Sequence, residues 1–386
     1  MKSLQMLVFI IVVLSVYTLA NYYVGLRGFQ SLPSFGWVKP AYIFLFTTLA
    51  FSYVFSRFLE KTSLYTLHHI TYWVGAFWMA ALMYLFLAVI LIDLIRFVNL
   101  GLHFLPAIGT TNYQTLKIAT LAGTVLLTSS VLGFGHWNAR SQQLKKLHIH
   151  IPKKAGNRDK LNIVMVSDIH LGSLFGKKEV DTMVTRINKL NPDIVLLAGD
   201  ILDEAQMPIF RNNTGEPLKN LKAKLGVYGI TGNHEYIGGI NSAVKYLESL
   251  NIKLLRDTSW LIDSSFYLAG REDRDGIRFS RKARKTLPDV LRNVDHKLPV
   301  ILLDHQPFHL DQAQNNGVDL QLSGHTHNGQ FWPMNLITQK MYEIDWGYLK
   351  KGNTHIYVSC GYGTWGPPIR IGNKPEMVQI EVLFKN

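Results

Sequence analysis

Side chains that can bind a metal ion follow five short apolar runs in the second half of the chain. Carboxylate, amide and imidazole groups of this kind suit divalent manganese, iron or zinc. Cys360 is the only cysteine, which excludes disulfides within one chain and metal sites built from cysteines. The candidates are Asp168 and His170 after "LNIVMVS", Asp200 after "DIVLLA", Asn233, His234 and Glu235 after "GVYGIT", His305 after "VILLD", and His325 and His327 after "LQLS".

The apolar runs before these side chains predict β-strands, because they are short and rich in β-branched residues. Amphipathic helical patterns at 177–190 and 241–250 alternate with them. This alternation predicts a layered α/β domain. In such domains ligands bind beyond the carboxyl ends of the strands, so we expect the candidate side chains to meet in one crevice. The glycines beside them permit sharp turns there.

The ordered blocks DxH, GD, GNHE, H and GHxH resemble the calcineurin-like metallophosphoesterase superfamily over roughly residues 160–382. The resemblance implies a four-layer α/β/β/α sandwich that holds two divalent ions, with manganese, iron and zinc all left open. Asp168, His170 and His327 would hold one ion, Asn233, His305 and His325 would hold the second, and Asp200 would bridge both. Side chains two residues apart, such as His325 and His327, can reach ions about 3.5–4 Å apart.

The same resemblance implies hydrolysis of a phosphoester or pyrophosphate by in-line attack of a metal-bound hydroxide. His234 would be catalytic and would donate to the leaving group or to charge on the phosphate. Glu235 would orient His234, or would be a surface carboxylate. The C-terminal stretch "YVSCGYGTWGPPIRIGNKPEMVQIEV" also resembles membrane-associated bacterial members. There Arg370 would clamp a phosphoryl oxygen or pair with Glu376.

The first part of the chain has a different composition, with Glu60 and Asp93 as its only acidic residues up to position 135. Apolar runs at about 5–24, 40–59, 70–98 and 116–135 each supply the roughly 20 residues that a membrane-crossing helix needs. We therefore predict about four transmembrane helices within residues 1–137, a basic linker at 138–160, and a catalytic domain at 161–386. Asp93 and Arg96 form an ion pair or a functional polar spot in this region.

The charge distribution predicts on which side of the membrane the catalytic domain lies and which partners the chain binds. Residues 138–160 carry seven cations against Asp159 alone, an excess that normally stays in the cytoplasm. Both termini and the catalytic domain are therefore expected on the cytoplasmic side, although Arg27 and Lys39 argue the other way. The net charge of +13 is concentrated in the segment 138–160 and in residues 271–285, and anionic membrane lipids explain the first of these clusters. No nucleic-acid-binding motif is present, so no nucleic acid is expected as a partner.

Attachment to a membrane favours a lipid-linked phosphate as the substrate, because enzyme and substrate then share one surface. The sequence does not choose between monoesterase, diesterase and pyrophosphohydrolase, and it leaves the oligomeric state open. A different class of function is a transporter or receptor whose phosphoesterase domain is regulatory or degenerate. Transport is disfavoured by the lack of paired, interrupted apolar segments. Degeneracy is disfavoured because all seven ligand positions carry competent side chains.

Overall fold

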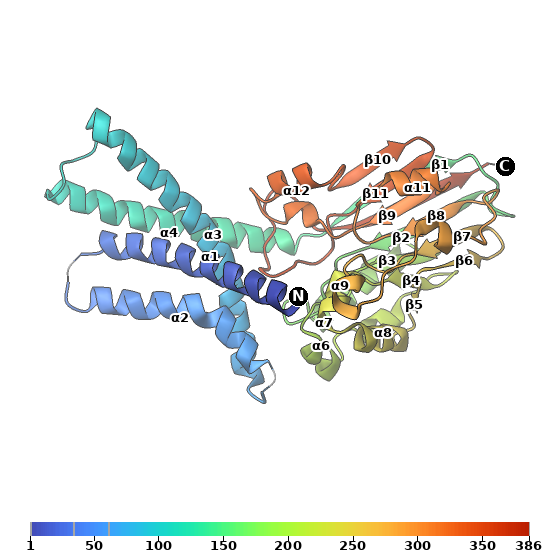
Figure 1. Ribbon diagram of the computed structural model, residues 1–386, viewed down its shortest axis with the longest axis horizontal. Helices are drawn as coiled ribbons and strands as arrows, with labels where there is room; N and C mark the ends of the chain where they lie inside the picture. The colour runs from blue at the N-terminus through green and yellow to red at the C-terminus, as the bar shows by residue number, and fades with distance from the viewer. Residues whose placement is uncertain (1, 34, 61, 386) are drawn as a thin grey trace. The chain divides into compact units, whose positions relative to one another are not determined.

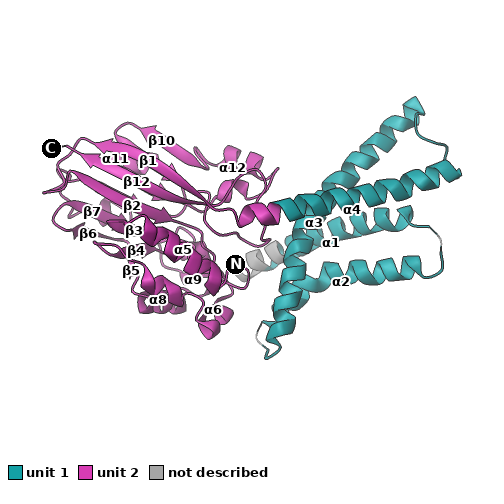
Figure 2. Cartoon of the chain, turned by 180° about the vertical axis from the view of Figure 1, so that it is seen from behind, with its two compact units in different colours: residues 1–134 teal, residues 135–386 magenta. Residues whose placement is uncertain are grey.

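The chain folds into two compact units, one from Met1 to Phe134 and one from Gly135 to Asn386 (Figure 2). The computed structural model describes residues 2–33, 35–60 and 62–385, without side chains at 2–6, 9 and 10. We call the unit from Met1 to Phe134 the helical unit and the unit from Gly135 to Asn386 the α/β unit.

The helical unit contains α1 (Lys2–Ser31), α2 (Val38–Leu59), α3 (Tyr65–Leu102) and most of α4 (Thr111–Ala139). Within the described residues, three helices are long and apolar enough to cross a membrane, namely α2, α3 and α4. The first predicted run, 5–24, falls on α1, and its opening side chains lie partly outside the described residues. The first of the four predicted crossings therefore stays a prediction.

Close packing and one ion-pair cluster hold the helices together. At Gly75 of α3 an added Cβ would lie 2.4 Å from the backbone nitrogen of Tyr53, so the glycine lets α2 and α3 approach closely. Asp93 pairs with Arg96 at 3.2 Å and with Arg27 of α1 at 2.6 Å. Tyr23 donates a hydrogen bond to the same carboxylate. Arg27 is thus part of the ion pair, which the sequence spacing did not indicate.

The α/β unit is built on two six-stranded sheets (Figure 1). The central strands of each sheet run parallel, so that their carboxyl ends meet at one edge. The first sheet has the order β1 (Gln143–Ile151), β12 (Glu376–Phe384), β2 (Lys160–Val166), β3 (Ile194–Ala198), β4 (Val227–Ile230), β5 (Lys253–Leu254). The second has the order β10 (Gly347–Lys351), β11 (Thr354–Val358), β9 (Leu320–Ser323), β8 (Val300–Leu303), β7 (Phe266–Gly270), β6 (Thr258–Ile262).

The predicted four layers are confirmed by the packing of the core. One buried cluster joins the inner faces of the sheets and includes Met165, Leu196 and Ile301. Helices α5 (Lys177–Lys189) and α8 (Ile240–Ser249) cover the outer face of the first sheet, and α10 (Leu287–Val290) and α11 (Asp311–Asn315) pack on the second. The connections carry α6 (Gln206–Asn212), η1 (Glu216–Asn220), α7 (Asn233–Gly238), α9 (Gly276–Ser280), η2 (His327–Gly329) and α12 (Asn335–Met341).

The segment 138–160, predicted as a basic linker, instead contains the strand β1 of the first sheet. Strand β1 pairs in parallel with β12 along its whole length, and the boundary between the units falls at Gly135. Leu147, Ile149 and Ile151 alternate along β1 and face the core between the sheets. The lysines and histidines between them conceal this strand pattern in the sequence.

Candidate metal centre

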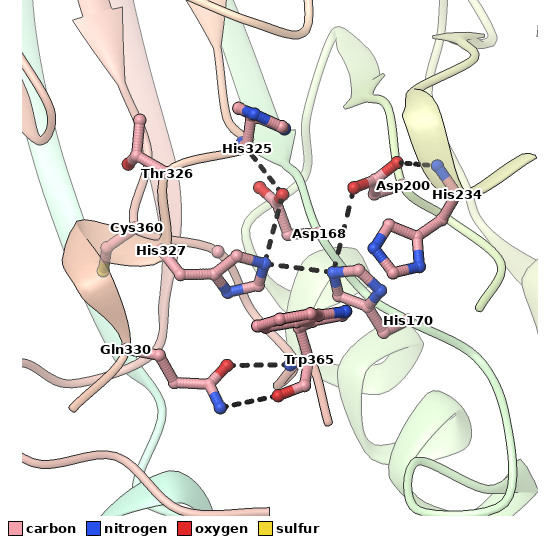
Figure 3. A network of polar contacts seen from close by, with 12 residues as sticks. Asp168, His170, Asp200, His234, His325, Thr326, His327, Gln330, Cys360 and Trp365 are labelled. Carbon is pink, nitrogen blue, oxygen red and sulfur yellow. Dashed lines mark hydrogen bonds and ion pairs between the residues drawn. The ribbon is translucent and has the colours of Figure 1, made fainter. Parts of the chain in front are cut away.

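All seven predicted ligands lie just beyond strand ends, and the structure brings them together in one largely buried cluster. Figure 3 shows five of them, namely Asp168, His170, Asp200, His325 and His327. Strands β2, β3 and β4 come from the first sheet, and β8 and β9 come from the second. The site therefore forms where the carboxyl ends of parallel strands from both sheets converge. Asp168 and His305 are fully buried at its centre.

The first group of donors consists of Asp168, His170 and His327. The Nε2 atoms of His170 and His327 lie 3.0 Å apart, and Oδ1 of Asp168 lies 3.4 Å from Nε2 of His327. Figure 3 shows the two imidazoles facing each other. Two imidazole nitrogens and a carboxylate at this spacing could hold a divalent ion.

The second group consists of Asp200, His305 and His325, and Asn233 lies beside it. Oδ2 of Asp200 is 3.1 Å from Nε2 of His305, and Oδ1 of Asn233 is 2.9 Å from Nδ1 of His325. The same Oδ2 of Asp200 is 4.0 Å from Nε2 of His170, which belongs to the first group. Asp200 is thus placed between the two groups.

The donor atoms fit divalent ions because they are buried with few other partners. Oδ2 of Asp168 has no hydrogen-bond partner, and Nε2 of His305 faces only the carboxylate of Asp200, itself a proposed ligand. Such atoms are costly to remove from water. Nδ1 of His305 donates to the carbonyl of Ala198 at 2.8 Å, so its other ring nitrogen is the one that faces the site. Bound cations would satisfy both atoms.

The electrostatics of the imidazoles also suit metal binding. Burial lowers the pKa of His325 to about 3, and burial together with Arg370 holds the pKa of His327 well below its ordinary value. Both rings are therefore neutral near pH 7, as ligands must be. Burial also opposes a charge on His305, but Asp200 and Asp168 outweigh it and hold that pKa well above the ordinary range. A cation is thus favoured at His305, and a metal ion would take the place of the proton.

His234 lies next to these groups but has different partners. Its Nδ1 is 3.1 Å from Oδ1 of Asp203 and 3.1 Å from Oε2 of Glu204. Burial opposes protonation, but Asp200, Asp203 and Glu204 outweigh it and hold the pKa of His234 well above the usual value. These carboxylates therefore favour the protonated ring, which is the form that can donate a proton. His170, Asp203 and His234 also form a third group with metal-ligand spacing, which is an alternative use of His234.

The ligand loops have unusual backbone geometry. Asp168, His170, Asp200, His325 and His327 all have positive φ, between 47° and 74°. Such conformations cost about 1–3 kcal/mol each in non-glycine residues and persist only where the surrounding fold imposes them. The neighbouring glycines are needed for close approach: a Cβ at Gly324 would lie 2.2 Å from Oδ2 of Asp168, and one at Gly232 would lie 2.2 Å from Oδ1 of Asp200.

Comparison with known proteins supports the same assignment. Residues 161–329 match the family described as calcineurin-like phosphoesterase. A metallophosphoesterase of Aquifex aeolicus is 33% identical over 58% of this chain and 86% of its own length. The chain belongs to the calcineurin-like metallophosphoesterase family. The clustered histidines and aspartates of this domain indicate a site for two divalent ions.

Other relatives bear on the rest of the chain. A metallophosphoesterase of Helicobacter pylori is 36% identical over 58% of this chain, and the chain covers only 60% of that protein. A Danio rerio protein described as a transmembrane protein with a metallophosphoesterase domain is 29% identical over 92% of this chain and 82% of its own length. The similarity to this relative thus extends beyond the phosphoesterase domain into the helical unit.

Neither predicted role of Glu235 in this metallophosphoesterase agrees with the structure. The carboxylate is fully buried and accepts hydrogen bonds from the backbone N–H groups of Leu202 and Gly232, each at 2.7 Å. It therefore ties the start of α7 to the loop after β3, and it is neither a surface group nor the partner of His234. Burial, and then Asp200, raise the pKa of Glu235 to about 8.

Arg370 does not form the predicted ion pair with Glu376 in the described part of the chain. The side chain is fully buried, and its guanidinium donates to the carbonyl oxygens of His327 at 3.2 Å and Gly363 at 2.6 Å. Nη2 of Arg370 also lies 3.1 Å from Nδ1 of His327. Arg370 thus supports the ligand His327, and its contact with a phosphoryl oxygen stays a prediction.

Three residues at the site were missed by the sequence analysis. Asp203 and Glu204 hold His234, and the ring of Trp365 lies 6.4 Å from the His234 ring, centroid to centroid (Figure 3). The acidic run "GDILDE" was a signal for the first two, because it follows a strand end directly. Trp365 gave no signal beyond its position in a glycine-rich turn.

Proposed function

We propose that this metallophosphoesterase hydrolyses a lipid-linked phosphoester or pyrophosphate at a pair of divalent ions. Asp168, His170 and His327 would hold one ion, and Asn233, His305 and His325 would hold the other. Asp200 would bridge them. The observation that carries the proposal is the convergence of two donor groups on Asp200, with donor atoms that face one another.

The residues around the ions have separate tasks in the proposed reaction. The ions, when bound, supply positive charge for the phosphoryl oxygens and lower the pKa of water. His234 donates its proton to the leaving-group oxygen, because Asp203 and Glu204 keep the ring charged and hold Nδ1 in place. Arg370 keeps His327 in position through the backbone carbonyl of the same residue. The chain itself forms no covalent bond to phosphorus.

A lipid-linked substrate is favoured by the helices in the same chain. Three apolar helices can hold the enzyme at a bilayer, where a substrate confined to that bilayer is present at high effective concentration. The excess of cationic residues in 138–160 favours the cytoplasmic face. Membrane lipids are accordingly the proposed partners.

The test uses the full chain reconstituted in phospholipid vesicles with Mn²⁺, Fe²⁺ or Zn²⁺. Lipid-linked monoesters, diesters and pyrophosphates are compared with soluble analogues of the same bond type, and products are followed by phosphorus NMR. We expect one lipid-linked class to be cleaved at least about tenfold faster than its soluble analogue. Faster cleavage of every soluble analogue would remove the lipid part of the proposal. Inactivity toward all substrates with two ions bound would remove the hydrolase part.

A further inference from the structure

Large apolar side chains are exposed around the metal centre. Trp332, Leu336, Ile337, Met341 and Trp365, which we call the apolar rim, are each at least 50% exposed. Three of them lie on α12, a helix in which no residue is buried. A water-soluble surface rarely keeps so many large apolar groups together, and such patches mark contacts with a partner or a membrane.

The apolar rim is attached directly to the residues of the site. Gln330, three residues after His327, donates to the carbonyl of Trp365 and accepts from its N–H, both at 2.7 Å. Asp345 links α12 to the same loop, because Thr338 and Asn328 both donate to its Oδ2. The apolar groups are therefore held rigidly beside the ligand His327.

The loop that carries Trp365 is also bonded to the end of a candidate membrane span. The last turn of α4 belongs to the α/β unit, and there Asn138 donates to the carbonyls of Arg370 and Asn373 at 3.0 and 2.7 Å. His136 lies 2.9 Å from the carbonyl of Pro368. Only a few helical residues, at about 1.5 Å each, separate these bonds from the apolar part of α4. This loop must therefore lie close to the membrane surface.

The composition of the apolar rim suits a bilayer surface better than a protein partner. Tryptophan is favoured in the headgroup layer, where its ring is apolar and its N–H is wet. The exposed cation Lys340 lies on α12 among the apolar side chains of the rim. Apolar groups with a cation beside them match the acyl and phosphate layers of an anionic membrane.

We propose that the apolar rim inserts into the headgroup layer of a phospholipid bilayer, so that the metal centre opens onto the membrane surface and receives its substrate there. Membrane contact of the rim is independent of the chemistry. Only the kinetic consequence rests on the proposed hydrolysis of a lipid-linked phosphate.

Insertion is measured with a fluorophore on the full chain in vesicles that contain quencher-labelled lipids. Ile337→Cys places the probe on the apolar rim, and Leu261→Cys on the edge strand β6 is the control, since the two side chains are 52% and 46% exposed. The native Cys360 is fully buried and stays unlabelled. We expect lipid quenchers to reduce the emission from position 337 by roughly half and to leave position 261 nearly unchanged. Equal quenching at the two positions would overturn the proposal.

A kinetic arm separates this inference from the proposed function. Ile337→Asp and the control Leu261→Asp are compared in reconstituted vesicles. The first should raise the apparent KM for the lipid-linked substrate roughly tenfold, because an apolar side chain no longer enters the bilayer. Cleavage of a soluble phosphodiester and metal content should stay unchanged. An unchanged KM would overturn the proposal that the substrate reaches the metal centre from the membrane. If position 337 is quenched and position 261 is not, but no lipid-linked substrate is hydrolysed, the result counts against the proposed function instead.

Discussion

The helical unit and the α/β unit differ in the apolar side chains that they expose and in the charged side chains that they bury. In the helical unit large apolar groups point outward, with Phe44 75% and Leu126 70% exposed, and the ion pair of Asp93 and Arg27 is partly covered. In the α/β unit the carboxylates and imidazoles of the site are buried, with Asp168 and His305 fully so. The first arrangement is stable in lipid, and the second is stable when cations satisfy the buried groups.

The backbone differs in the same way. The helical unit uses long regular helices, which satisfy their own hydrogen bonds, as a membrane requires. The α/β unit places five of its ligand residues at positive φ, where the local chain is strained. The regular helices thus suit attachment to a membrane, and the strained loops place the side chains that carry the chemistry. Substitutions in one unit should therefore leave the other largely unaffected, which the following experiments test.

The largest effect is expected for Asp200→Ala. Both ions lose a ligand, and several kcal/mol of charge stabilisation disappears, so turnover should fall at least about 1,000-fold. Metal analysis should show loss of both ions, while the exposed control Asp181→Ala keeps them. Two ions retained by Asp200→Ala would contradict the bridging role.

His234→Ala should lower turnover by about 100- to 10,000-fold, the usual range for loss of a general acid. Metal content should remain that of the wild type, because His234 lies outside both proposed ligand sets. His148→Ala, on the exposed side of β1, is the matched control. Loss of metal from His234→Ala would show that the group of His170, Asp203 and His234 binds an ion instead.

Arg370→Lys tests whether Arg370 holds the metal ligand His327 in position. Lysine keeps the charge but cannot donate to the carbonyls of His327 and Gly363 together, so metal affinity should fall roughly 10- to 100-fold. Titration with a metal indicator measures this directly, with the exposed Arg292→Lys as the control. If excess metal failed to restore turnover, Arg370 would have a role beyond positioning.

Gly75→Leu should have the smallest effect on catalysis. The added side chain meets the backbone of Tyr53, and overpacking of this kind costs about 1–3 kcal/mol, so the helical unit should lose thermal stability in detergent. Gly123→Leu on α4 is the control, because nothing lies within 4 Å of its added Cβ. Turnover of a soluble phosphodiester should stay within about twofold in both. A loss of bound metal in Gly75→Leu would mean that the two units are not independent.

Much of this protein could be predicted from local patterns. The run "LNIVMVS" predicted β2, the amphipathic pattern at 177–190 predicted α5, and the uninterrupted apolar runs predicted the long helices. The position of each ligand just after a strand also followed from the sequence, because apolar periodicity depends on neighbouring residues alone. The family resemblance supplied the four layers, which the packing confirms.

Other features were decided only when distant segments came together. The cations of β1 concealed a strand whose partner, β12, lies at the other end of the chain. The direction in which a side chain leaves its turn decides which groups it reaches. This direction decides which carboxylate holds His234 and which backbone groups Glu235 and Arg370 bind. The sequence by itself therefore determined the candidate ligands and the strands that precede them. Only the tertiary structure decided their partners, because burial, strain and electrostatic coupling arise from atoms that are near in space and remote in sequence.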